Sequence, residues 1–574
     1  MVRLTNTVFT SVSNSHKKYN KKTMKKFLPK QLSVGLTLAF MLLPLATIGQ
    51  SIEQQVDALL SAKYVDNKPG ATALIAKDGK VIYRKAFGMA NLELKIAMKP
   101  DNVLEIGSMT KQFTAVAILM LEEAGKLSVD DPVTKFFADY PTGENEITIH
   151  HLLNHTSGIK SYTGMESFQT QARTDMDPLT LIDVFKNEPM DFKTGEQWSY
   201  NNSGYIILGA IIEQVSGQSY ADFIQTQIFD VLGMTHSYYG SKSNLIPNRA
   251  SGYQPTESGY RNAAYLSMTL PYAAGSLMST VDDLLIWQEA LNDNKLIPRK
   301  RLEKAFVNTT LNDGSATNYG YGWSIDEING TPTIEHGGGI FGYTTYGLNI
   351  PEDDIYVTVL TNSNGNSPTN VAVKMGAIAI GKPYPTTSTA SVGETAMQKW
   401  VGSYKFDGGV VRFITLEDGS LYSQRQGSDK LKLNAISENE FYFEDSFTKY
   451  NFSIKDGKRI AFFQDRINKA EGLEANVPMP AEKAQIEVSK EVLANYIGTY
   501  ELQPGFEIKV WQEQSQLIAQ ATGQGPFEIY PSAAHEFFLK VVEATIIFDV
   551  DAKGVATAMT LYQGGQTMPG KKKD

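Results

Sequence analysis

The chain contains 574 residues, of which 42% are hydrophobic and 20% are charged. This is about three to four times the length of a typical domain, so we expect several domains with packed cores, and extensive disorder is excluded. The absence of cysteine excludes disulfides, thiolate metal sites, a cysteine nucleophile and a lipidated N-terminal cysteine. The net charge is −9, and no basic stripe suited to nucleic acid lies beyond the first 50 residues.

Residues 1–50 carry eight positive charges and no negative one, so the remaining residues together carry a net charge of −17. The basic stretch leads into an apolar run over residues 32–46, and small residues follow. This order is typical of a secretory signal. The alternative, an uncleaved anchor, is disfavoured because the run is shorter than the ~20 apolar residues of a membrane-spanning helix. We therefore expect an exported protein, periplasmic or extracellular, without a stable membrane span and with a mature chain that begins near Gln50 or Ser51.

Residues 51–381 contain strand-like and helix-like patterns. Two apolar runs at 71–76 and 81–87 flank an Asp-Gly pair, which predicts a tight hairpin. Residues 108–124 predict a long buried helix that ends at Gly125. Further helices are expected at 204–216, 220–231 and 282–292, and further strands at 344–349 and 356–361. Strands at both ends with helices between them predict an α/β domain whose sheet is assembled from distant segments.

After residue 381 the composition changes, and glycine, proline, threonine and serine predict a linker over 382–395. The tail then repeats itself. Residues 400–404 (WVGSY) match residues 496–500 (YIGTY) at an offset of 96, and Phe452 matches Phe548 at the same offset. We therefore expect two copies of a β-rich unit, over 396–475 and 488–574, with a linker at 476–487. Antiparallel strands of this size commonly close into small barrels.

Ser108 and Lys111 lie three positions apart at the start of the predicted helix 108–124, so their side chains share one face. A serine becomes a nucleophile when a neighbour takes its proton, and a lysine can take that proton or favour its loss electrostatically. The N–H groups of a first helical turn are unpaired, so the Ser108 amide can bind an oxyanion. The alternative is a capping serine beside a solvated lysine, but an unpaired charge on this apolar helix is costly.

Several further motifs accompany this pair. In chain order, the motifs are Gly70-Ala71, Lys77–Lys80, Ile106–Ala115, His151–Gly158, Gly195–Tyr205, Leu232–Met234, Tyr319–Trp323 and His336–Gly339. Together they resemble the serine β-lactamase and penicillin-binding-protein family, in particular its class C-like, peptidase S12-type branch of esterases, D-aminopeptidases and D,D-peptidases. The resemblance implies a β-lactamase/transpeptidase-like α/β (α+β) domain, in which helices flank an antiparallel sheet and a helical subdomain is added. The two small all-β repeats follow it.

By this resemblance Ser108 is the nucleophile that forms an acyl-enzyme, and Lys111 is its proton partner. Tyr200, from the family's Y-x-N motif, is implied as general base and then as the acid that protonates the leaving group. A tyrosine with a pKa of ~10 can do this near neutrality only if a cation such as Lys111 favours its ionised form. Lys111 therefore has two possible roles, which the sequence does not separate. Asn202 is implied to hold substrate and lysine. The alternative for Tyr200 and Asn202 is a loop aromatic and a turn asparagine.

His336-Gly337-Gly338 occupies the place of the family's Lys-Thr-Gly motif, on a strand that lines the site. Glycines such as Gly338 let a substrate approach the strand edge, and the N–H of Gly339 is the expected second oxyanion donor. A lysine is a permanent cation for a substrate carboxylate, whereas a histidine is mostly neutral at pH 7. His336 therefore puts penicillin hydrolysis in doubt, while esters, amides and D-amino-acid peptides remain open. The alternative is a loop histidine between two turns.

The expected function is an exported serine hydrolase acting on a small-molecule or peptide substrate, which could derive from the cell wall, with no cofactor. The competing interpretation is a penicillin-type receptor or cell-wall-binding protein that acylates and turns over slowly or not at all. No metal site is expected, because His150, His151 and His155 lack the acidic partner of an H-E-x-x-H motif. Asp282 and Asp283 are interpreted as part of a helix start rather than as acid catalysts. The oligomeric state stays open.

Overall fold

The computed structural model describes residues 51–573 except 166, 257, 366, 385–389, 427, 429, 445, 480–484, 504–505, 523–524, 540–543 and 564–565. The signal predicted over residues 1–50 and parts of both predicted linkers lie outside these residues. Within the described part of the chain, no helix is long and apolar enough to cross a membrane.

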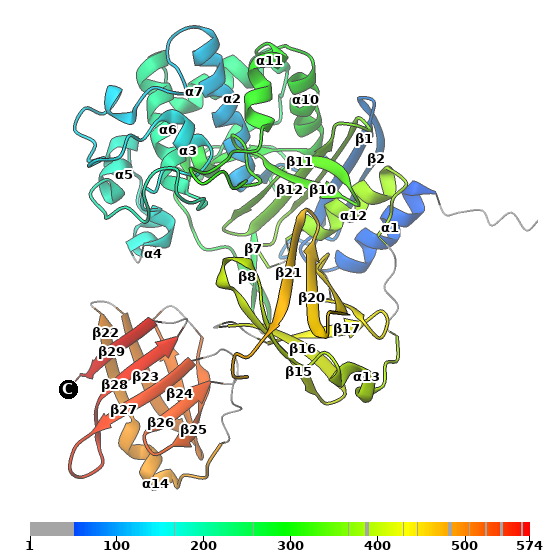
Figure 1. The fold of residues 1–574 in the computed structure, drawn as a ribbon. Helices are drawn as coiled ribbons and strands as arrows, with labels where there is room; N and C mark the ends of the chain where they lie inside the picture. The colour runs from blue at the N-terminus through cyan, green and yellow to red at the C-terminus, as the bar shows by residue number, and fades with distance from the viewer. Residues whose placement is uncertain are drawn as a thin grey trace, which may run out of the picture. The chain divides into compact units, whose positions relative to one another are not determined.

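A six-stranded antiparallel sheet forms the centre of the first region, in the order β10-β11-β12-β13-β1-β2 (Figure 1). Its strands are β1 (Ala71–Lys77), β2 (Lys80–Phe87), β10 (Ser324–Ile328), β11 (Thr331–Ile340), β12 (Tyr343–Ile350) and β13 (Ile355–Thr361). The first and last of these in the chain, β1 and β13, pair from Ala71 opposite Thr361 to Lys77 opposite Ile355. The expected assembly from distant segments is confirmed. The β1–β2 turn is tight because Asp78 (φ 48°) and Gly79 (φ 67°) both adopt left-handed conformations.

Helices cover both faces of this sheet. On one face lie α1 (Ile52–Lys63) and α12 (Thr369–Ala379), whose Val56, Leu60 and Val373 share a core with strand residues such as Val357. The larger core on the other face is built mainly by helices. These helices are α2 (Thr110–Glu123), α3 (Ile149–Leu153), α4 (Ser167–Gln171), α5 (Pro178–Phe185), α6 (Asn202–Ser216), α7 (Tyr220–Ile224), α8 (Asp230–Leu232), α9 (Tyr272–Gly275), α10 (Val281–Asn292) and α11 (Arg299–Leu302).

Two predicted helices differ in detail. The first turn of the helix expected at 108–124 is a 3-10 turn, Gly107–Met109, and α2 follows it. The helix expected at 220–231 consists of α7, a π-helical segment at Gln225–Phe229 and α8. Short strand pairs surround the helices: β3 (Met89–Asn91) with β4 (Ile96–Ala97), β9 (Leu277–Ser279) between β5 (Leu104–Glu105) and β6 (Tyr238–Tyr239), and β7 (Tyr253–Thr256) with β8 (Gly259–Asn262).

Each of the two tail repeats is a closed barrel of eight antiparallel strands, each paired with its neighbours in the chain. The first contains β14 (Gly402–Lys405), β15 (Val411–Glu417), β16 (Ser420–Arg425), β17 (Lys430–Ala435), β18 (Glu440–Tyr442), β19 (Lys449–Lys455), β20 (Lys458–Asp465) and β21 (Asn468–Ala475). The second contains β22 (Gly498–Gln503), β23 (Phe506–Glu513), β24 (Gln516–Ala521), β25 (Phe527–Ala533), β26 (Glu536–Leu539), β27 (Ala544–Val550), β28 (Ala556–Gln563) and β29 (Gln566–Lys572). Short helices, α13 (Glu394–Gln398) and α14 (Lys490–Leu493), precede the barrels.

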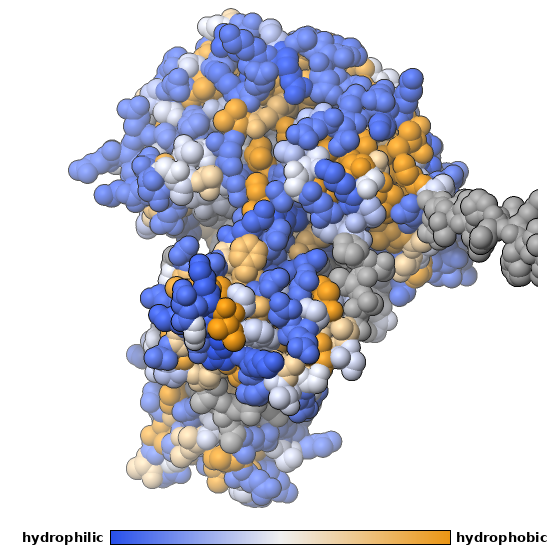
Figure 2. All heavy atoms as spheres, turned by 45° about the vertical axis from the view of Figure 1, so that its right-hand side comes forward, coloured by the Kyte–Doolittle hydropathy of each residue, from blue (hydrophilic) through white to orange (hydrophobic). Residues whose placement is uncertain are grey.

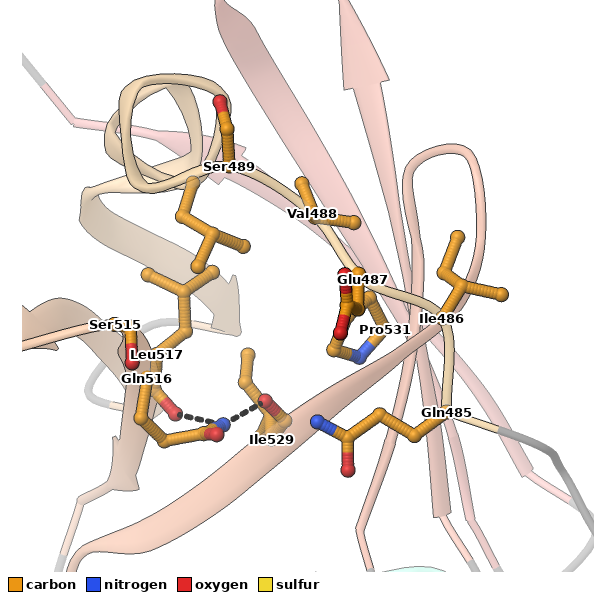
Figure 3. A pocket seen from close by; sticks show the side chains of 11 residues that line it. Gln485, Ile486, Glu487, Val488, Ser489, Ser515, Gln516, Leu517, Ile529 and Pro531 are labelled. Carbon is orange, nitrogen blue, oxygen red and sulfur yellow. Dashed lines mark hydrogen bonds between the residues drawn. The ribbon is translucent and has the colours of Figure 1, made fainter.

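The repeated residues form the same contacts in both barrels. The Tyr404 hydroxyl donates to the Trp400 carbonyl at 2.8 Å, and the Tyr500 hydroxyl donates to the Tyr496 carbonyl at 2.8 Å. In the second barrel, residues 485–489 run beside β25, where the Ile486 amide donates to the Pro531 carbonyl. They enclose a cavity of about 510 Å³, in which the Gln516 amide donates to the Ile529 carbonyl (Figure 3). Hydrophilic residues cover most of the face drawn in Figure 2, as expected when apolar side chains fill separate cores.

Candidate active site

Ser108 lies in the 3-10 turn directly before α2, with its side chain at the wall of a pocket. The preceding Gly107 has a φ of +52°, and a Cβ atom there would lie 2.9 Å from the Gly339 nitrogen. Glycine is therefore required at position 107 for two reasons: the backbone is left-handed, and β11 approaches too closely for a side chain. This packing brings the start of α2 against the Gly339 segment of β11.

The Lys111 side chain is fully buried beneath Ser108. Its Nζ lies 3.3 Å from Ser108 Oγ, and it donates to Asn202 Oδ1 at 2.8 Å and to the Ala274 carbonyl at 2.9 Å. Burial lowers the pKa of Lys111 well below its usual 10.5. A neutral amine has two N–H donors and one lone pair. When Lys111 is neutral, the two carbonyl acceptors account for both N–H donors, and the lone pair faces the Ser108 hydroxyl.

Asn202 and Tyr200 come from the segment that leads into α6. Asn201 caps this helix, because its side chain accepts from the Gly204 amide. Asn202 Oδ1 accepts from Lys111, while its Nδ2 donates to Thr163 Oγ1 at 3.0 Å. The side-chain amide of Asn202 is therefore held at both ends, with its oxygen toward the lysine.

The Tyr200 ring lies with its centroid 4.8 Å from Lys111 Nζ. Its hydroxyl is buried and makes no well-formed hydrogen bond among the described residues. Burial raises the pKa of Tyr200 above its usual 10, and the nearby Ser108 hydroxyl acts in the opposite direction. The Tyr200 hydroxyl is therefore protonated at neutral pH and lies near Ser108. Both properties suit a proton donor.

His336 lies on β11 and is 6% exposed. The Tyr319 hydroxyl lies 2.9 Å from His336 Nε2 and 3.3 Å from His155 Nε2, and His336 Nδ1 lies 2.5 Å from the Gly337 carbonyl. The Asn201 amide donates to His155 Nδ1 at 3.1 Å. All of these contacts are satisfied when each group donates a hydrogen bond to the next. The Asn201 amide donates to His155, His155 to Tyr319, Tyr319 to His336, and His336 to the Gly337 carbonyl. Both imidazoles are then neutral.

The pKa values agree with this assignment. Burial is the main cause that lowers the pKa of His336 from 6.5 to about 4, against the effect of the Gly337 carbonyl. Burial also lowers the pKa of His155 well below 6.5. At neutral pH, His336 therefore supplies no positive charge where the family's lysine would supply one.

Gly338 and Gly339 have different surroundings on the same strand. A Cβ atom on Gly338 would collide with the Ile106 carbonyl and with Thr345 Oγ1, whereas a Cβ atom on Gly339 would meet nothing within 4 Å. Gly338 therefore packs β11 against the segment before Ser108. Gly339 faces the open site and, with Ser108, lines its pocket.

The pocket at Ser108 has a volume of about 220 Å³. Aromatic and aliphatic side chains, among them Tyr162, Phe168, Leu266 and Phe341, form much of its wall, and none of its lining residues is charged. The sequence interpretation did not identify this wall, because its residues come from separate segments of the chain without a shared motif. For the same reason, the sequence did not predict that Thr163 contacts Asn202 or that the Ala274 carbonyl accepts from Lys111.

The other candidate residues from the sequence have structural roles. His155 has a positive φ of 65° and packs against the Tyr200 ring at 4.4 Å between centroids, so it shapes the loop that carries Tyr200. Among the described residues, no group of three or more His, Asp or Glu could hold a metal. Thr280 caps α10, while Asp282 pairs with Arg84 and the buried Asp283 accepts from Ser237. The interpretation of Asp282 and Asp283 as part of a helix start is confirmed: both lie in the first turn of α10.

The first barrel contributes a cation to the strand that carries His336. Arg466, in the β20–β21 turn, donates to both Glu335 oxygens at 2.6 and 2.9 Å, to Thr333 Oγ1 and to the Glu327 carbonyl. The Arg466 and Glu335 side chains are 7% and 2% exposed. Tyr346 donates to the same carboxylate at 2.6 Å. The carboxylate next to His336 is thus neutralised from the barrel.

Comparisons with known proteins agree with this architecture. A family model described as Beta-lactamase matches residues 56–379, and a domain of unknown function, DUF3471, matches residues 482–572. Penicillin-binding protein 4* of Bacillus subtilis (strain 168) is 30% identical over 417 residues, which cover 68% of this chain and 91% of that protein. A D-aminopeptidase of Gluconobacter oxydans (strain 621H) is 26% identical over 328 residues, 56% of this chain and 61% of that protein. The structure of the octameric penicillin-binding protein homologue from Pyrococcus abyssi matches with a TM-score of 0.53 and 29% identity, covering 73% of this chain and 99% of that one.

Proposed function

Because the chain belongs to the beta-lactamase family, we propose that it is an exported serine hydrolase that cleaves an ester or amide bond through an acyl-enzyme on Ser108. The observation that carries this proposal is the buried Lys111 amine, 3.3 Å from Ser108 Oγ, with two carbonyl oxygens accepting its protons. Such an amine is a general base next to a nucleophile at the wall of a pocket.

In the first half-reaction, Lys111 takes the Ser108 proton while Oγ bonds to the substrate carbonyl carbon. The amides of Ser108 and Gly339 hold the resulting oxyanion. When the scissile bond breaks, the leaving group takes the proton of Tyr200, whose raised pKa keeps it protonated beforehand. The acyl-enzyme then stands beside a Lys111 ammonium and a Tyr200 phenolate, two opposite charges that stabilise each other.

In the second half-reaction, the Tyr200 phenolate takes a proton from water as the water oxygen attacks the acyl carbon. Ser108 Oγ departs with the proton held by Lys111. The serine, the amine and the phenol all return to their starting states. In this scheme Lys111 is the base for acylation and Tyr200 is the base for deacylation, which assigns one of the two possible roles of Lys111.

The substrate proposed for this site is neutral near the scissile bond and apolar in its acyl part. None of the residues that line the pocket is charged, and His336 is neutral. A substrate carboxylate therefore has no cation at the position of the family's lysine, which disfavours penicillin hydrolysis. Esters, and amides of D-amino acids with apolar side chains, suit the aromatic wall; the D-aminopeptidase relative supports the amide.

A second candidate function is a receptor that acylates and turns over slowly, which the relative named as a penicillin-binding protein supports. Two probes separate the functions: a fluorophosphonate and a labelled penicillin, each tested on the wild type and on Ser108→Ala. We expect fluorophosphonate labelling of the wild type only, and turnover of p-nitrophenyl esters or D-amino-acid anilides. Equal labelling of the variant would exclude Ser108 as the nucleophile. Labelling by penicillin without turnover of either substrate class would favour the receptor.

Export is proposed on the sequence of residues 1–50, where a basic stretch precedes an apolar run. The test is fractionation of cells that express the full chain, with N-terminal sequencing of the product. We expect a product outside the cytoplasm that begins near Ser51. A full-length product in the cytoplasm would contradict the proposal.

A further inference from the structure

The second barrel contains a partly open cavity of about 250 Å³. Its lining comes from several strands and is aliphatic or aromatic except for Gln563; it includes Ile508, Ala519, Leu539, Ala544, Ile546 and Leu561. An eight-stranded barrel is just wide enough for its own side chains to fill it, or to hold one small ligand. Side chains of this size leave part of the interior unfilled.

The first barrel carries larger side chains at several positions equivalent to the lining of this cavity. Strand pairing identifies the equivalent positions: Ile546 lies opposite Leu561 in the second barrel, as Tyr450 lies opposite Phe463 in the first. Likewise Ile508 lies opposite Ala521, as Arg412 lies opposite Arg425. Every one of these positions carries a larger side chain in the first barrel.

Those larger side chains contact one another inside the first barrel. The Tyr450 hydroxyl bonds with Ser423 at 2.8 Å, and its ring packs on Phe463 at 5.4 Å between centroids. The Arg412 guanidinium lies 4.4 Å from the Phe463 ring centroid. In the second barrel, Ala519 and Ile546 replace the Ser423–Tyr450 pair.

The other end of the interior is the same in both barrels. Tyr404 packs against Phe452 in the first barrel, and Tyr500 packs against Phe548 in the second. Phe441 and Phe537 lie against the same two phenylalanines. The two barrels therefore share one packed layer and differ in the layer that leaves the cavity.

We propose that the second barrel binds one neutral, apolar small molecule of about eight to ten carbon atoms, because an apolar cavity of ~150 Å³ holds benzene and this one is larger. A charged ligand is disfavoured, because none of the residues that line the cavity could pair with it. Gln563, at the end of β28, is the polar residue of the lining and is placed to bind a hydroxyl or amide at one end of the ligand. This assigns a ligand class to the region matched by the domain of unknown function and does not depend on Ser108.

The test is isothermal titration of the mature full-length protein with 2-naphthol. The variant Ala519→Ser/Ile546→Tyr copies the first barrel's hydrogen-bonded pair into the cavity. We expect it to lose one equivalent of bound probe per chain, while ester hydrolysis is unchanged. Lys509→Tyr, which places the same ring on the exposed outer face of β23, is the matched control and should bind as the wild type does.

A second variant shows whether a loss of binding in the double variant is caused by misfolding. Leu561→Phe copies Phe463 and should weaken binding at least tenfold, with an unchanged far-ultraviolet circular dichroism spectrum. Gln516→Ala alters the neighbouring cavity of Figure 3 and should leave binding unchanged. Three results would overturn the proposal: no saturable binding by the wild type, equal binding by both filled variants, or loss of binding in Gln516→Ala.

Discussion

The ion pair between Arg466 and Glu335 gives a quantitative prediction about the stability of the catalytic strand. Arg466→Met leaves the Glu335 carboxylate, which is 2% exposed, with the Tyr346 and Thr333 hydroxyls as its donors among the described residues. Removing one partner of a buried ion pair costs about 3–5 kcal/mol. Because two donors remain, we expect a loss near the lower limit, about 3 kcal/mol.

The assay is the urea concentration at which half of the ester-hydrolysing activity of the mature chain is lost. For a slope of about 3 kcal/mol/M, the predicted loss lowers this midpoint by about 1 M. The double variant Arg466→Met/Glu335→Gln removes the unpaired charge and should recover at least half of the shift. Lys469→Met, which removes a half-exposed amine 3.8 Å from Glu327, should change stability by less than about 1 kcal/mol. The reasoning is refuted if the double variant unfolds at the same urea concentration as Arg466→Met.

Three further predictions concern the active site. Lys111→Met should slow acylation about 10²–10⁴-fold in single-turnover kinetics with little change in KM; a wild-type rate would exclude Lys111 as the base. The low pKa of His336, about 4, means that the unfolded chain binds a proton first on acidification, so about 3 kcal/mol of stability is lost as the pH falls from about 6.5 to 4. Urea titrations should show a flatter pH dependence in His336→Gln, and an equal slope would contradict this. Gly338→Ala should lower stability by about 3 kcal/mol in the same titrations, whereas Gly339→Ala should retain stability and alter only kinetics.

Features that depend on neighbouring residues could be predicted from the sequence. The Asp78-Gly79 turn has both left-handed residues that a tight hairpin needs, and the repeated tyrosines Tyr404 and Tyr500 form the same hydrogen bond. The family motifs also predicted that Ser108, Lys111 and Asn202 lie together, and these three residues are in contact. The turn and the tyrosine hydrogen bonds have their physical cause within a few residues, whereas the position of Asn202 beside Lys111 was predicted from the family resemblance.

Long-range contacts could not be predicted in the same way. The Ala274 carbonyl and Thr163 hold Lys111 and Asn202 from other segments, and any residue with a carbonyl or a hydroxyl could have done so. Arg466 reaches Glu335 from the first barrel, and a single arginine in a hairpin turn gives no sign of a buried partner. The sequence places a histidine at position 336, but its low pKa follows from burial, which only the fold shows.

The pairing of β1 with β13 has a consequence for when the candidate site can form during synthesis. The chain is made from its N-terminus, so the segment with Ser108 and Lys111 exists long before residues 355–361 can join residues 71–77 at the centre of the sheet. Until then β1 lacks its neighbour, and helix α12 is not yet present to cover the sheet. Ser108 and Lys111 are therefore synthesised early, but the site proposed around them cannot form until almost the whole region up to residue 361 has been synthesised.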